Sequence, residues 1–398
     1  MSFAMAAIVT LSTPALARPY SEQAFASWLN QMREQALVMQ IRPSLVDDFF
    51  DSIRYLPKVV RADRRQPQQT IDVLSYLERT VPPSRQARAR ARYAQYQDLL
   101  GAVQTDSSIP APVIVALWGV ESDFGRITGS TPVASALATL AFEGRRERFF
   151  TQELFTLLRL IDTGQIPALG PEGALQGSWA GAMGQSQFMP STLAAYGVDA
   201  DGDGRVDLWS SLPDVFASIA NFLRQEGWDS AQPWGYGVTI PDAFDWAVVG
   251  ATRPWSFWAG VGVRLDPAMP SPPADLALTL TAPAGHHGPA FLTSGNFERI
   301  LRWNRSTFFA LSVGLLSDHI AARPVPDYSQ ADAPRPLTRD QVRQLQQALH
   351  RWGFDPGEID GRVGARTRAA IRAAQKRWHL PPDGFADLGL LERLANPP

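Results

Sequence analysis

The fold of this chain is indicated by one stretch of sequence, Pro112-Val-Ile-Val-Ala-Leu-Trp-Gly-Val-Glu-Ser-Asp-Phe-Gly-Arg126. Pro110 and Pro112 suit the first turn of a helix, where a missing N–H costs nothing. Gly125 suits the position that closes a helix at its C-terminus. Because residues 113–120 are apolar on every side of such a helix, the stretch predicts a helix that is buried rather than amphipathic.

This stretch places one carboxylate, Glu121, at the end of the otherwise apolar run. A carboxyl group in such surroundings should resist ionisation, and a raised pKa is what a general acid needs near neutral pH. The alternative is a structural role, in which Glu121 pairs with Arg126 near the helix end. The stretch by itself favours the structural role, and the rest of the sequence reverses that preference.

Length and composition limit the classes of protein to consider. The chain has 398 residues, which predicts two or three domains, and it is 45% hydrophobic, which is enough for sizeable cores. A net charge of −2 argues against nucleic-acid binding. Since there is no cysteine, there is no disulfide, no thiolate metal site and no lipid-anchored N-terminal cysteine.

The N-terminus resembles a secretion signal over Met1–Ala17, with an apolar run at 4–11 and a small-x-small cleavage pattern at the end. The usual positive charge before the apolar run is missing, which a start codon placed too far downstream would explain. No other segment is apolar for long enough to span a bilayer. We therefore expect a soluble, exported, periplasmic protein whose mature chain starts near Arg18.

The hydrophobic pattern divides the rest of the chain into helical regions and one insert. Apolar residues recur at helical spacing over 20–100 and again over 107–224. Residues 238–289 are rich in proline and glycine and contain the alternating run Leu276, Leu278 and Leu280, which predicts a small strand-containing insert.

After a return to helix at 297–320, residues 322–336 contain four prolines and predict an extended linker. The last part, 337–394, is a compact module of three helices. A capping box between Thr338 and Gln341 predicts the start of its first helix.

A second notable segment runs from Gly177 to Ser191 and combines closely spaced glycines with Ser178, Gln185 and Gln187. Glycines let a backbone approach a ligand closely, and amide side chains supply hydrogen bonds to hydroxyl or acetamido groups. The alternative is a loop that only packs helices together.

A third segment, Asp199-Ala-Asp-Gly-Asp-Gly-Arg-Val-Asp207, has the acidic spacing of an EF-hand calcium loop. Ser210 stands where the usual bidentate acid would be, so we expect weak, structural binding of Ca²⁺, with a dissociation constant of about 10⁻⁴ M. The alternative is a solvated acidic turn. The predicted ligands are Asp199, Asp201, Asp203, the Arg205 carbonyl, Asp207 and, through a longer loop, Asp214.

Three further features are less specific. Arg145-Arg146 could bind an anionic group or be solvated, and Asn304 could cap a helix or contact a ligand. His286-His287 lies in a glycine- and proline-rich loop and is interpreted as incidental rather than metal-binding. No nucleophile elbow, phosphate-binding loop or dinucleotide-binding fingerprint is present.

Together these segments resemble the lytic murein transglycosylases of the B type, glycoside hydrolase family 103, in the right order over about residues 20–320. The module at 337–394 resembles the three-helix peptidoglycan-binding domain, with Asp360-Gly-x-x-Gly364 among its matches. The matching segments of the first region are Trp118–Arg126, Ala136–Phe142 with Arg145-Arg146, Gly177–Ser191, the acidic loop and Trp303–Ser306.

The resemblance implies a mainly α fold: a lysozyme-like helical catalytic core over 18–321 with the strand-containing insert, and a separate three-helix domain over 337–398. It implies one catalytic residue, Glu121, which protonates the glycosidic oxygen between MurNAc and GlcNAc. Glu121 then acts as base on the C6 hydroxyl of MurNAc and leaves a 1,6-anhydro end, without water. The residues agree, because ordinary glycosidases need a second carboxylate about 5–9.5 Å away, and Asp123 would point to another helix face. Glu143, Glu147 and Glu153 stay open as partners.

The resemblance also assigns residues that contact the peptidoglycan glycan strand. Arg145 and Arg146 would meet the peptide stem or the lactyl carboxylate. The residues expected to line the sugar cleft are Ser178, Gln187, the hydrophobic Met189, Asn304, and Trp303, which stands where the family often has tyrosine.

Two other functions remain open at this point. One is a goose-type or similar muramidase that hydrolyses the same bond with a positioned water. The other is a non-catalytic wall-binding protein that attaches through the C-terminal module.

Overall fold

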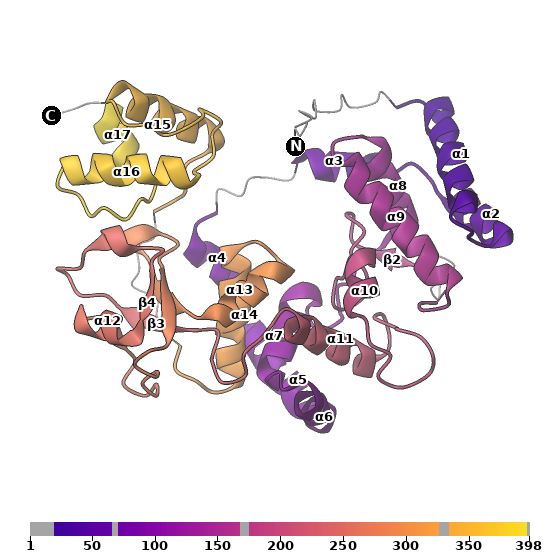
Figure 1. Ribbon diagram of the computed structural model, residues 1–398, viewed down its shortest axis with the longest axis horizontal. Coiled ribbons are helices and arrows are strands. Elements are labelled where there is room, and N and C mark those ends of the chain that lie inside the picture. Colours follow the sequence, from indigo (N-terminus) through magenta and orange to yellow (C-terminus); the bar gives the residue numbers. More distant parts are fainter. Residues whose placement is uncertain (1–19, 66–70, 168–174, 326–333, 396–398) are drawn as a thin grey trace, which may run out of the picture. The chain divides into compact units, whose positions relative to one another are not determined.

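The computed structural model describes residues 20–65, 71–167, 175–325 and 334–395. The expected signal segment and the middle of the expected linker lie outside these residues. The chain forms two compact units, each assembled from separate stretches: Met1–Gln66 with Thr128–Asp214, and Pro67–Ile127 with Val215–Pro398. Figure 1 shows the elements of both, which are predominantly helical.

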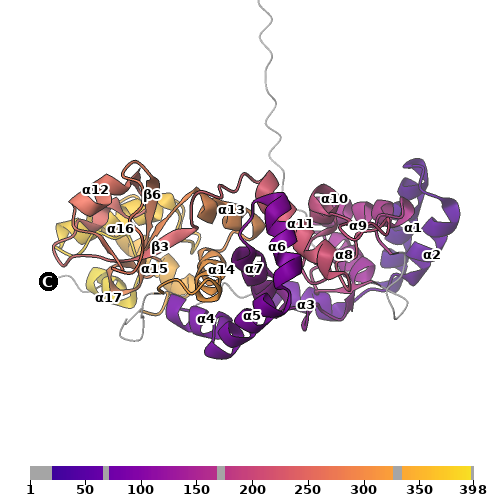
Figure 2. The ribbon, with the colours of Figure 1, turned by 90° about the horizontal axis from the view of Figure 1, so that it is seen from below.

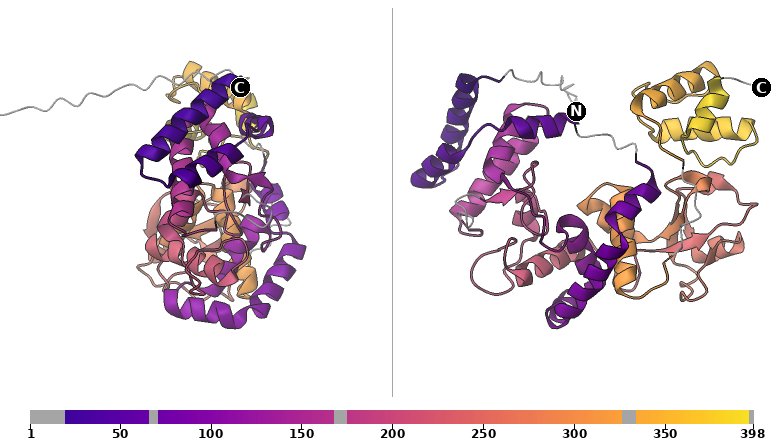
Figure 3. Two further views of the ribbon diagram at one scale, coloured as in Figure 1. Left: turned by 90° about the vertical axis from the view of Figure 1, so that its right-hand side faces the viewer. Right: turned by 180° about the vertical axis from the view of Figure 1, so that it is seen from behind.

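The first unit is built around the contact between two successive helices, α8 and α9, and α8 is buried on all sides. The contacting pair α1 and α2 belongs to the same unit and is drawn in indigo in Figure 3. A short strand pair joins β1 (Thr131–Pro132) to β2 (Gln176–Gly177). Its helices are α1 (Glu22–Val38), α2 (Pro43–Ser52), α3 (Pro57–Arg65), α8 (Val133–Phe142), α9 (Glu147–Asp162) and α10 (Pro190–Tyr196).

The second unit has the predicted buried helix, α7, at its centre, packed along α14. This helix begins at Ala111 and ends at Ser122, where Asp123 takes the left-handed conformation with φ of 50°. The expectation that Gly125 closes the helix is therefore wrong, because the turn is made two residues earlier. The helices around α7 are α4 (Val73–Thr80), α5 (Pro83–Gln95), α6 (Gln97–Ser107), α11 (Leu212–Gln225), α13 (Gly295–Trp303) and α14 (Thr307–Ile320).

The strand-containing insert is confirmed as a five-stranded antiparallel sheet in the order β4-β6-β7-β3-β5. Leu278 and Leu280 are fully buried on one face of β6, as the alternation predicted. A short helix, α12 (Trp255–Gly260), accompanies the sheet (Figure 2). The strands are β3 (Gly235–Thr239), β4 (Thr252–Pro254), β5 (Arg264–Leu265), β6 (Ala277–Thr281) and β7 (Ala290–Thr293).

The C-terminal module has the three predicted helices: α15 (Arg339–Arg351), α16 (Ala365–Arg377) and α17 (Leu388–Ala395). The capping box between Thr338 and Gln341 is present at the start of α15. These helices enclose a core of their own. The module belongs to the same unit as the sheet and lies beside it in Figures 1 and 2.

Among the described residues, no single helix has both the length and the apolar character needed to cross a membrane. Helices α6 and α7 reach these limits only when taken together, and they are bent by 113° with respect to each other.

Candidate active site

Glu121 occupies the last turn of α7, which the surrounding packing holds in place. Gly119 is pressed against the ring of Phe124, since a Cβ at position 119 would lie 2.6 Å from that ring. Trp118 is buried and makes edge-on contacts with Phe124 and Phe216. The helix end is thus fixed by close contacts on several sides, while the Glu121 side chain remains half-buried.

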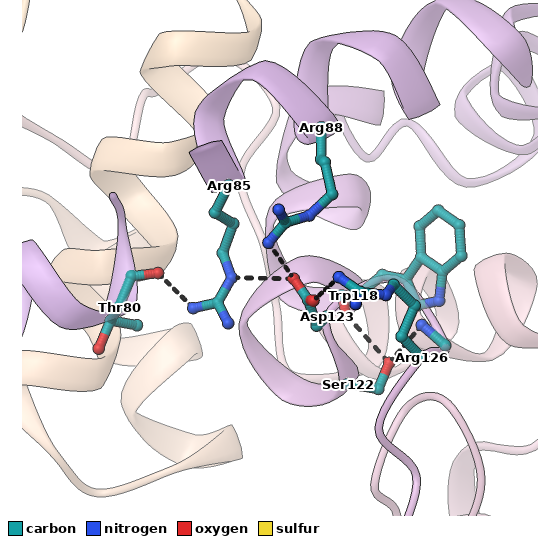
Figure 4. Close-up of polar contacts among 8 residues, drawn as sticks. Thr80, Arg85, Arg88, Trp118, Ser122, Asp123 and Arg126 are labelled. Atoms are coloured by element: carbon teal, nitrogen blue, oxygen red, sulfur yellow. Dashed lines mark hydrogen bonds and ion pairs between the residues drawn. The ribbon is translucent and has the colours of Figure 1, made fainter. Parts of the chain in front are cut away.

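Directly after the helix, Asp123 receives hydrogen bonds from three arginines (Figure 4). Arg85 Nε lies 3.2 Å and Arg88 Nη2 2.9 Å from Asp123 Oδ1, and Arg126 Nη1 lies 2.7 Å from Oδ2. Burial by itself would raise the Asp123 pKa, but the hydrogen bonds from Arg88 and Arg85 outweigh it and hold the pKa below its ordinary value. Asp123 is therefore an ionised structural carboxylate. The structural alternative that paired Arg126 with Glu121 is wrong, because Arg126 pairs with Asp123.

The surroundings of Glu121 shift its pKa in the opposite direction. Burial raises the pKa of Glu121 to about 7, and a hydrogen bond from Trp303 opposes that rise in part. Trp303 Nε1 donates to Glu121 Oε1 over 2.7 Å, and the Trp303 ring packs edge-on against Phe222 with ring centroids 4.8 Å apart. Within the described ranges no basic side chain forms an ion pair with Glu121. The carboxyl group can therefore hold a proton near neutral pH, as the sequence predicted.

Tyr76 on α4 is a neighbour of Glu121 that the sequence analysis missed. Burial raises the Tyr76 pKa, a hydrogen bond with Thr80 lowers it, and the negative charge of Glu121 raises it further. The Tyr76 ring also contacts Phe308, with centroids 5.5 Å apart. Nothing in the local sequence marks this tyrosine, because it is one aromatic residue on an ordinary amphipathic helix.

Trp303 and Asn304, two more of the predicted site residues, lie in the second unit. Trp303 is the last residue of α13, and Asn304 follows it as the C-cap, with its N–H bonded to the Ile300 carbonyl 3.2 Å away. Asn304 is exposed. The structure thus brings Trp303 to Glu121 directly and gives Asn304 the capping role that the sequence left open.

The glycine-rich segment belongs to the first unit, and its polar side chains fold the segment on itself. Ser178 Oγ accepts a hydrogen bond from the Ala182 N–H over 3.0 Å. Gln187 Nε2 donates to the carbonyls of Thr128 and Gly184 over 3.0 and 2.8 Å. The loop is therefore held by hydrogen bonds within itself and to Thr128.

Glycine is required in this segment by close backbone contacts. A Cβ at Gly184 would lie 2.4 Å from the Leu208 carbonyl oxygen. Met189, after the loop, is the half-buried N-cap of α10. Sugar contacts by Ser178, Gln187 and Met189 stay predictions.

Arg145 and Arg146 both pair with the buried Asp63 of the first unit. Arg145 Nη2 lies 2.7 Å and Arg146 Nη2 3.0 Å from Asp63 Oδ1. The Arg146 guanidinium also lies over the Phe150 ring, 4.6 Å from its centroid. These contacts hold both arginines in place. Binding of an anionic part of a substrate by Arg145 and Arg146 stays a prediction.

Two of the three carboxylates that the sequence left open, Glu143 and Glu153, have hydrogen-bond donors within the first unit. Glu143 accepts hydrogen bonds from the Tyr55 hydroxyl and from Arg64 Nη2. Glu153 accepts from the Ser191 N–H over 2.8 Å and from its hydroxyl over 2.6 Å. Both side chains therefore already serve as acceptors within the fold.

The acidic loop gathers the first three predicted metal ligands. Asp199, Asp201 and Asp203 each place a carboxylate oxygen within 4.8 Å of the others. Asp214 is fully buried and accepts the N–H groups of Ala200 and Asp207, each over 2.8 Å, so that it closes the loop. Three converging carboxylates provide the hard oxygen ligands that suit Ca²⁺.

Two family models match this chain. The model of the transglycosylase SLT domain matches residues 24–318, and that of the putative peptidoglycan binding domain matches residues 338–394. Membrane-bound lytic murein transglycosylase B of Escherichia coli (strain K12) is 32% identical over 254 residues, which are 62% of this chain and 67% of that protein.

Solved structures agree with these matches. SltB3 from Pseudomonas aeruginosa in complex with NAG-anhNAM-pentapeptide is 42% identical, with a TM-score of 0.87 over 94% of this chain and all of that chain. SltB1 from the same organism is 29% identical, with a TM-score of 0.64 over 75% of this chain and 98% of that chain. The Escherichia coli lytic transglycosylase Slt35 in complex with calcium is 25% identical, with a TM-score of 0.62 over 78% of this chain and 99% of that chain.

Proposed function

The chain belongs to the lytic murein transglycosylases of the B type, which act on peptidoglycan, and from this premise we propose that Glu121 is the acid and then the base of the reaction. The bond cleaved is the β-1,4 bond between MurNAc and GlcNAc. The observation that carries the proposal is the raised pKa of Glu121, about 7, on a carboxyl group whose Oε1 is fixed by Trp303. Such a group is protonated in part at neutral pH and is held in one orientation.

In the first step the Glu121 proton moves to the glycosidic oxygen, which leaves with the bonding electrons as the 4-hydroxyl of GlcNAc. Positive charge then develops at C1 of MurNAc. The Glu121 carboxylate takes the proton of the C6 hydroxyl, and O6 bonds to C1. Atoms balance without water, and Glu121 ends the cycle protonated.

Hydrolysis would require a second carboxylate to activate water. The nearest acid in the sequence, Asp123, receives hydrogen bonds from three arginines and has a lowered pKa. Its engagement favours the intramolecular route over the muramidase. SltB3 from Pseudomonas aeruginosa, the relative at 42% identity, has been crystallised with NAG-anhNAM-pentapeptide, whose anhydro sugar is the product class of this route.

Glycan contacts are proposed for residues in each unit separately. In the second unit, Trp303 donates a hydrogen bond to Glu121, and Asn304, the next residue along the chain, offers an exposed amide. In the first unit the proposed contacts are Ser178, Gln187, Met189, Arg145 and Arg146. We further propose that residues 18–321 form the catalytic region, 322–336 a linker and 337–398 the peptidoglycan-binding domain.

Calcium binding by the acidic loop is proposed as a structural function, supported by the three gathered carboxylates. The Escherichia coli relative Slt35 was crystallised in complex with calcium. When bound, the ion would neutralise Asp199, Asp201 and Asp203 and tie the loop together. Export to the periplasm through residues 1–17 is proposed because peptidoglycan lies outside the cytoplasm.

The mechanism is tested by digesting purified sacculi with the full chain and with Glu121→Gln, followed by mass spectrometry of the products. We expect muropeptides lighter by one water than hydrolysis products, and none from the variant. Products with ordinary reducing ends would identify a muramidase. Equal products from both proteins would exclude Glu121 as the acid.

A further inference from the structure

A cavity of about 480 Å³ lies in the second unit, where the C-terminal module meets the sheet and the start of α14. Its walls are formed by residues 280–283 at and after the end of β6, by Thr307 and Phe308 of α14, and by parts of the module that include Val363 and Phe385. The volume falls within the range of about 300–1,000 Å³ that is usual for small-molecule sites. The proposed mechanism makes no use of this cavity.

Two of the charged side chains in the wall are arginines of the same helix. Arg368 and Arg372 lie four positions apart on α16, so they project from the same face, with Cβ atoms about 5–6 Å apart. Arg372 is fixed in the wall, since its Nη2 donates to the Val249 carbonyl over 2.9 Å. Arg368 is exposed, and neither arginine forms an ion pair with an acid in the part of the chain that the structure describes.

Asp383 is the third charged residue of the wall, and its carboxylate is already occupied. Its Oδ1 accepts hydrogen bonds from Gln375 Nε2 over 2.7 Å and from the Phe385 N–H over 2.8 Å. Its Oδ2 accepts the His286 N–H over 2.9 Å, and only 1% of the side chain is exposed. Asp383 therefore pairs with neither arginine, and the cavity keeps an excess of positive charge.

This wall restricts a ligand by charge and by size. A guanidinium group binds a carboxylate through two parallel N–H···O bonds, which a cationic group cannot accept. Most of the remaining wall consists of proline, phenylalanine and aliphatic side chains, so it suits small apolar groups beside the carboxylate. A peptide that ends in alanine combines these features, because its methyl groups adjoin a free carboxylate.

Phe308 connects this cavity with the surroundings of Glu121. Its ring forms part of the cavity wall and contacts the Tyr76 ring, with centroids 5.5 Å apart. Tyr76 in turn neighbours Glu121, whose charge adds to the effect of burial on the Tyr76 pKa. Two aromatic side chains thus lie between the cavity and Glu121, so a peptide attached to a sugar at Glu121 starts near the cavity.

We propose that this cavity binds the carboxyl-terminal end of a peptidoglycan stem peptide, with Arg368 on the carboxylate and the apolar walls around the D-alanine side chains. The choice of a stem peptide rests on the proposed function, since the substrate of that function carries such peptides. The charge and the small size of the peptide end determine which strands the site holds. The site takes no part in the chemistry at Glu121.

The test is an NMR titration of the full-length protein with a free stem pentapeptide that ends in D-Ala-D-Ala. The same peptide with a C-terminal amide is the matched ligand, because it keeps the shape and loses the charge. We expect the backbone amide signals of residues 368–372 to shift and saturate with the acid. The amidated peptide should bind roughly tenfold more weakly, because the pairing with the guanidinium group is lost.

Arg368→Gln should weaken binding of the acid roughly tenfold and should give the acid and the amidated peptide equal affinities. Arg368→Lys keeps the charge without the planar fork and should bind with an intermediate affinity. The matched control is Arg366→Gln, on the same helix but outside the cavity and paired with Asp355, and it should bind like the wild-type protein.

Equal affinities of the wild-type protein for the acid and the amidated peptide would overturn this site. Shifts confined to residues 145–150 would also overturn it, because they would place the peptide at the arginines of the first unit. Anhydro products from sacculi without any shift at 368–372 would overturn the site and leave the proposed function standing. Binding that depends on Arg368, together with sacculus products that lack anhydro ends, would refute the transglycosylase mechanism and keep the peptide site.

Discussion

At the scale of single residues, Glu121 and Asp123 show how two carboxylates two positions apart acquire opposite properties. Glu121 gains little besides the Trp303 hydrogen bond to offset its burial, and its pKa rises to about 7. Asp123 is also buried, but the arginines around it lower its pKa. The arginines around Asp123 therefore keep that carboxyl group ionised, whereas burial without such partners leaves Glu121 able to serve in the proposed acid–base role.

Trp303→Phe is expected to extend activity to higher pH. In the proposed mechanism Glu121 must be protonated for the first step, so kcat/KM should fall as pH rises through the pKa of Glu121. The Trp303 N–H stabilises the carboxylate, so removing it should raise the pKa and move the alkaline limb upward by about 0.5–1 unit. The rate at the optimum should fall, because the carboxyl group is no longer held in place. The measurement is the pH profile of muropeptide release.

Trp209→Phe is the matched control, because Trp209 Nε1 donates to the Gln176 carbonyl in the first unit, 2.8 Å away. The alkaline limb of the Trp209→Phe pH profile should coincide with that of the wild-type protein. An alkaline limb in Trp303→Phe that stays in place or moves to lower pH would contradict the role of Trp303.

At the scale of elements, α7 is a helix whose position is set at its ends. Apolar contacts bury its middle, and Asp123 ties its C-terminus to two arginines of α5. The turn that follows contains two successive left-handed residues, Asp123 and Phe124, with φ of 50° and 64°. This conformation is costly for residues other than glycine, so the ion pairs help to hold it.

Asp123→Asn should lower both stability and activity. Two partly buried guanidinium groups, Arg85 and Arg88, would lose their counter-charge, and we expect a loss of about 2–4 kcal/mol in the free energy of unfolding. The turn would relax and Glu121 would shift, so kcat should fall more than KM rises. Thermal unfolding and steady-state kinetics measure the two effects.

The control for Asp123→Asn is Asp355→Asn, which breaks an exposed ion pair with Arg366 in the C-terminal module. It should change neither quantity measurably. Wild-type kcat in a folded Asp123→Asn protein would show that the arginine cluster does not position Glu121.

The acidic loop at 199–207 is predicted to bind Ca²⁺, and this binding should stabilise the folded protein measurably. If Ca²⁺ binds with a dissociation constant of about 10⁻⁴ M, about 10 mM Ca²⁺ should stabilise the protein by about 2.7 kcal/mol. Asp203→Asn should abolish most of this gain, and Mg²⁺ at the same concentration should give a smaller one. Thermal unfolding in chelator and in each metal measures it, and equal effects of both ions would contradict a calcium site.

At the scale of the whole molecule, the C-terminal module contacts the sheet of the second unit. Asp383 accepts hydrogen bonds from the His286 N–H over 2.9 Å and from its Nδ1 over 2.7 Å. Arg372 Nη2 donates to the Val249 carbonyl over 2.9 Å. A Cβ at Gly285 would lie 2.2 Å from Asp383 Oδ2. His286, which the sequence analysis interpreted as incidental rather than metal-binding, thus has a structural role, because it joins two elements distant in sequence.

The double variant His286→Ala/Arg372→Ala should loosen this contact. Each substitution removes one hydrogen bond across it, so backbone amides at 249–251 and 285–288 should exchange with solvent roughly tenfold faster. Hydrogen–deuterium exchange measures the change. Arg366→Ala, in the same module but paired with Asp355, is the control and should leave these segments unchanged. Equal exchange in all three proteins would show that these contacts do not hold the module.

The sequence by itself determined the elements and the candidate acid. Local signals suffice for these: an apolar run with one carboxylate for α7, alternating leucines for β6, a capping box for α15 and acidic spacing for the loop. Each depends on residues within one turn or strand of one another. The family motifs carry the same kind of local information.

Only the tertiary structure decided which side chains meet across the chain. Trp303 reaches Glu121 over 182 positions, three arginines gather on Asp123, and Asp383 meets His286 over 97 positions. The two compact units likewise combine stretches far apart in sequence. The pKa of a carboxyl group depends on burial and on such distant partners, so the sequence could name Glu121 as the candidate acid, but only the folded chain shows why its pKa and that of Asp123 shift in opposite directions.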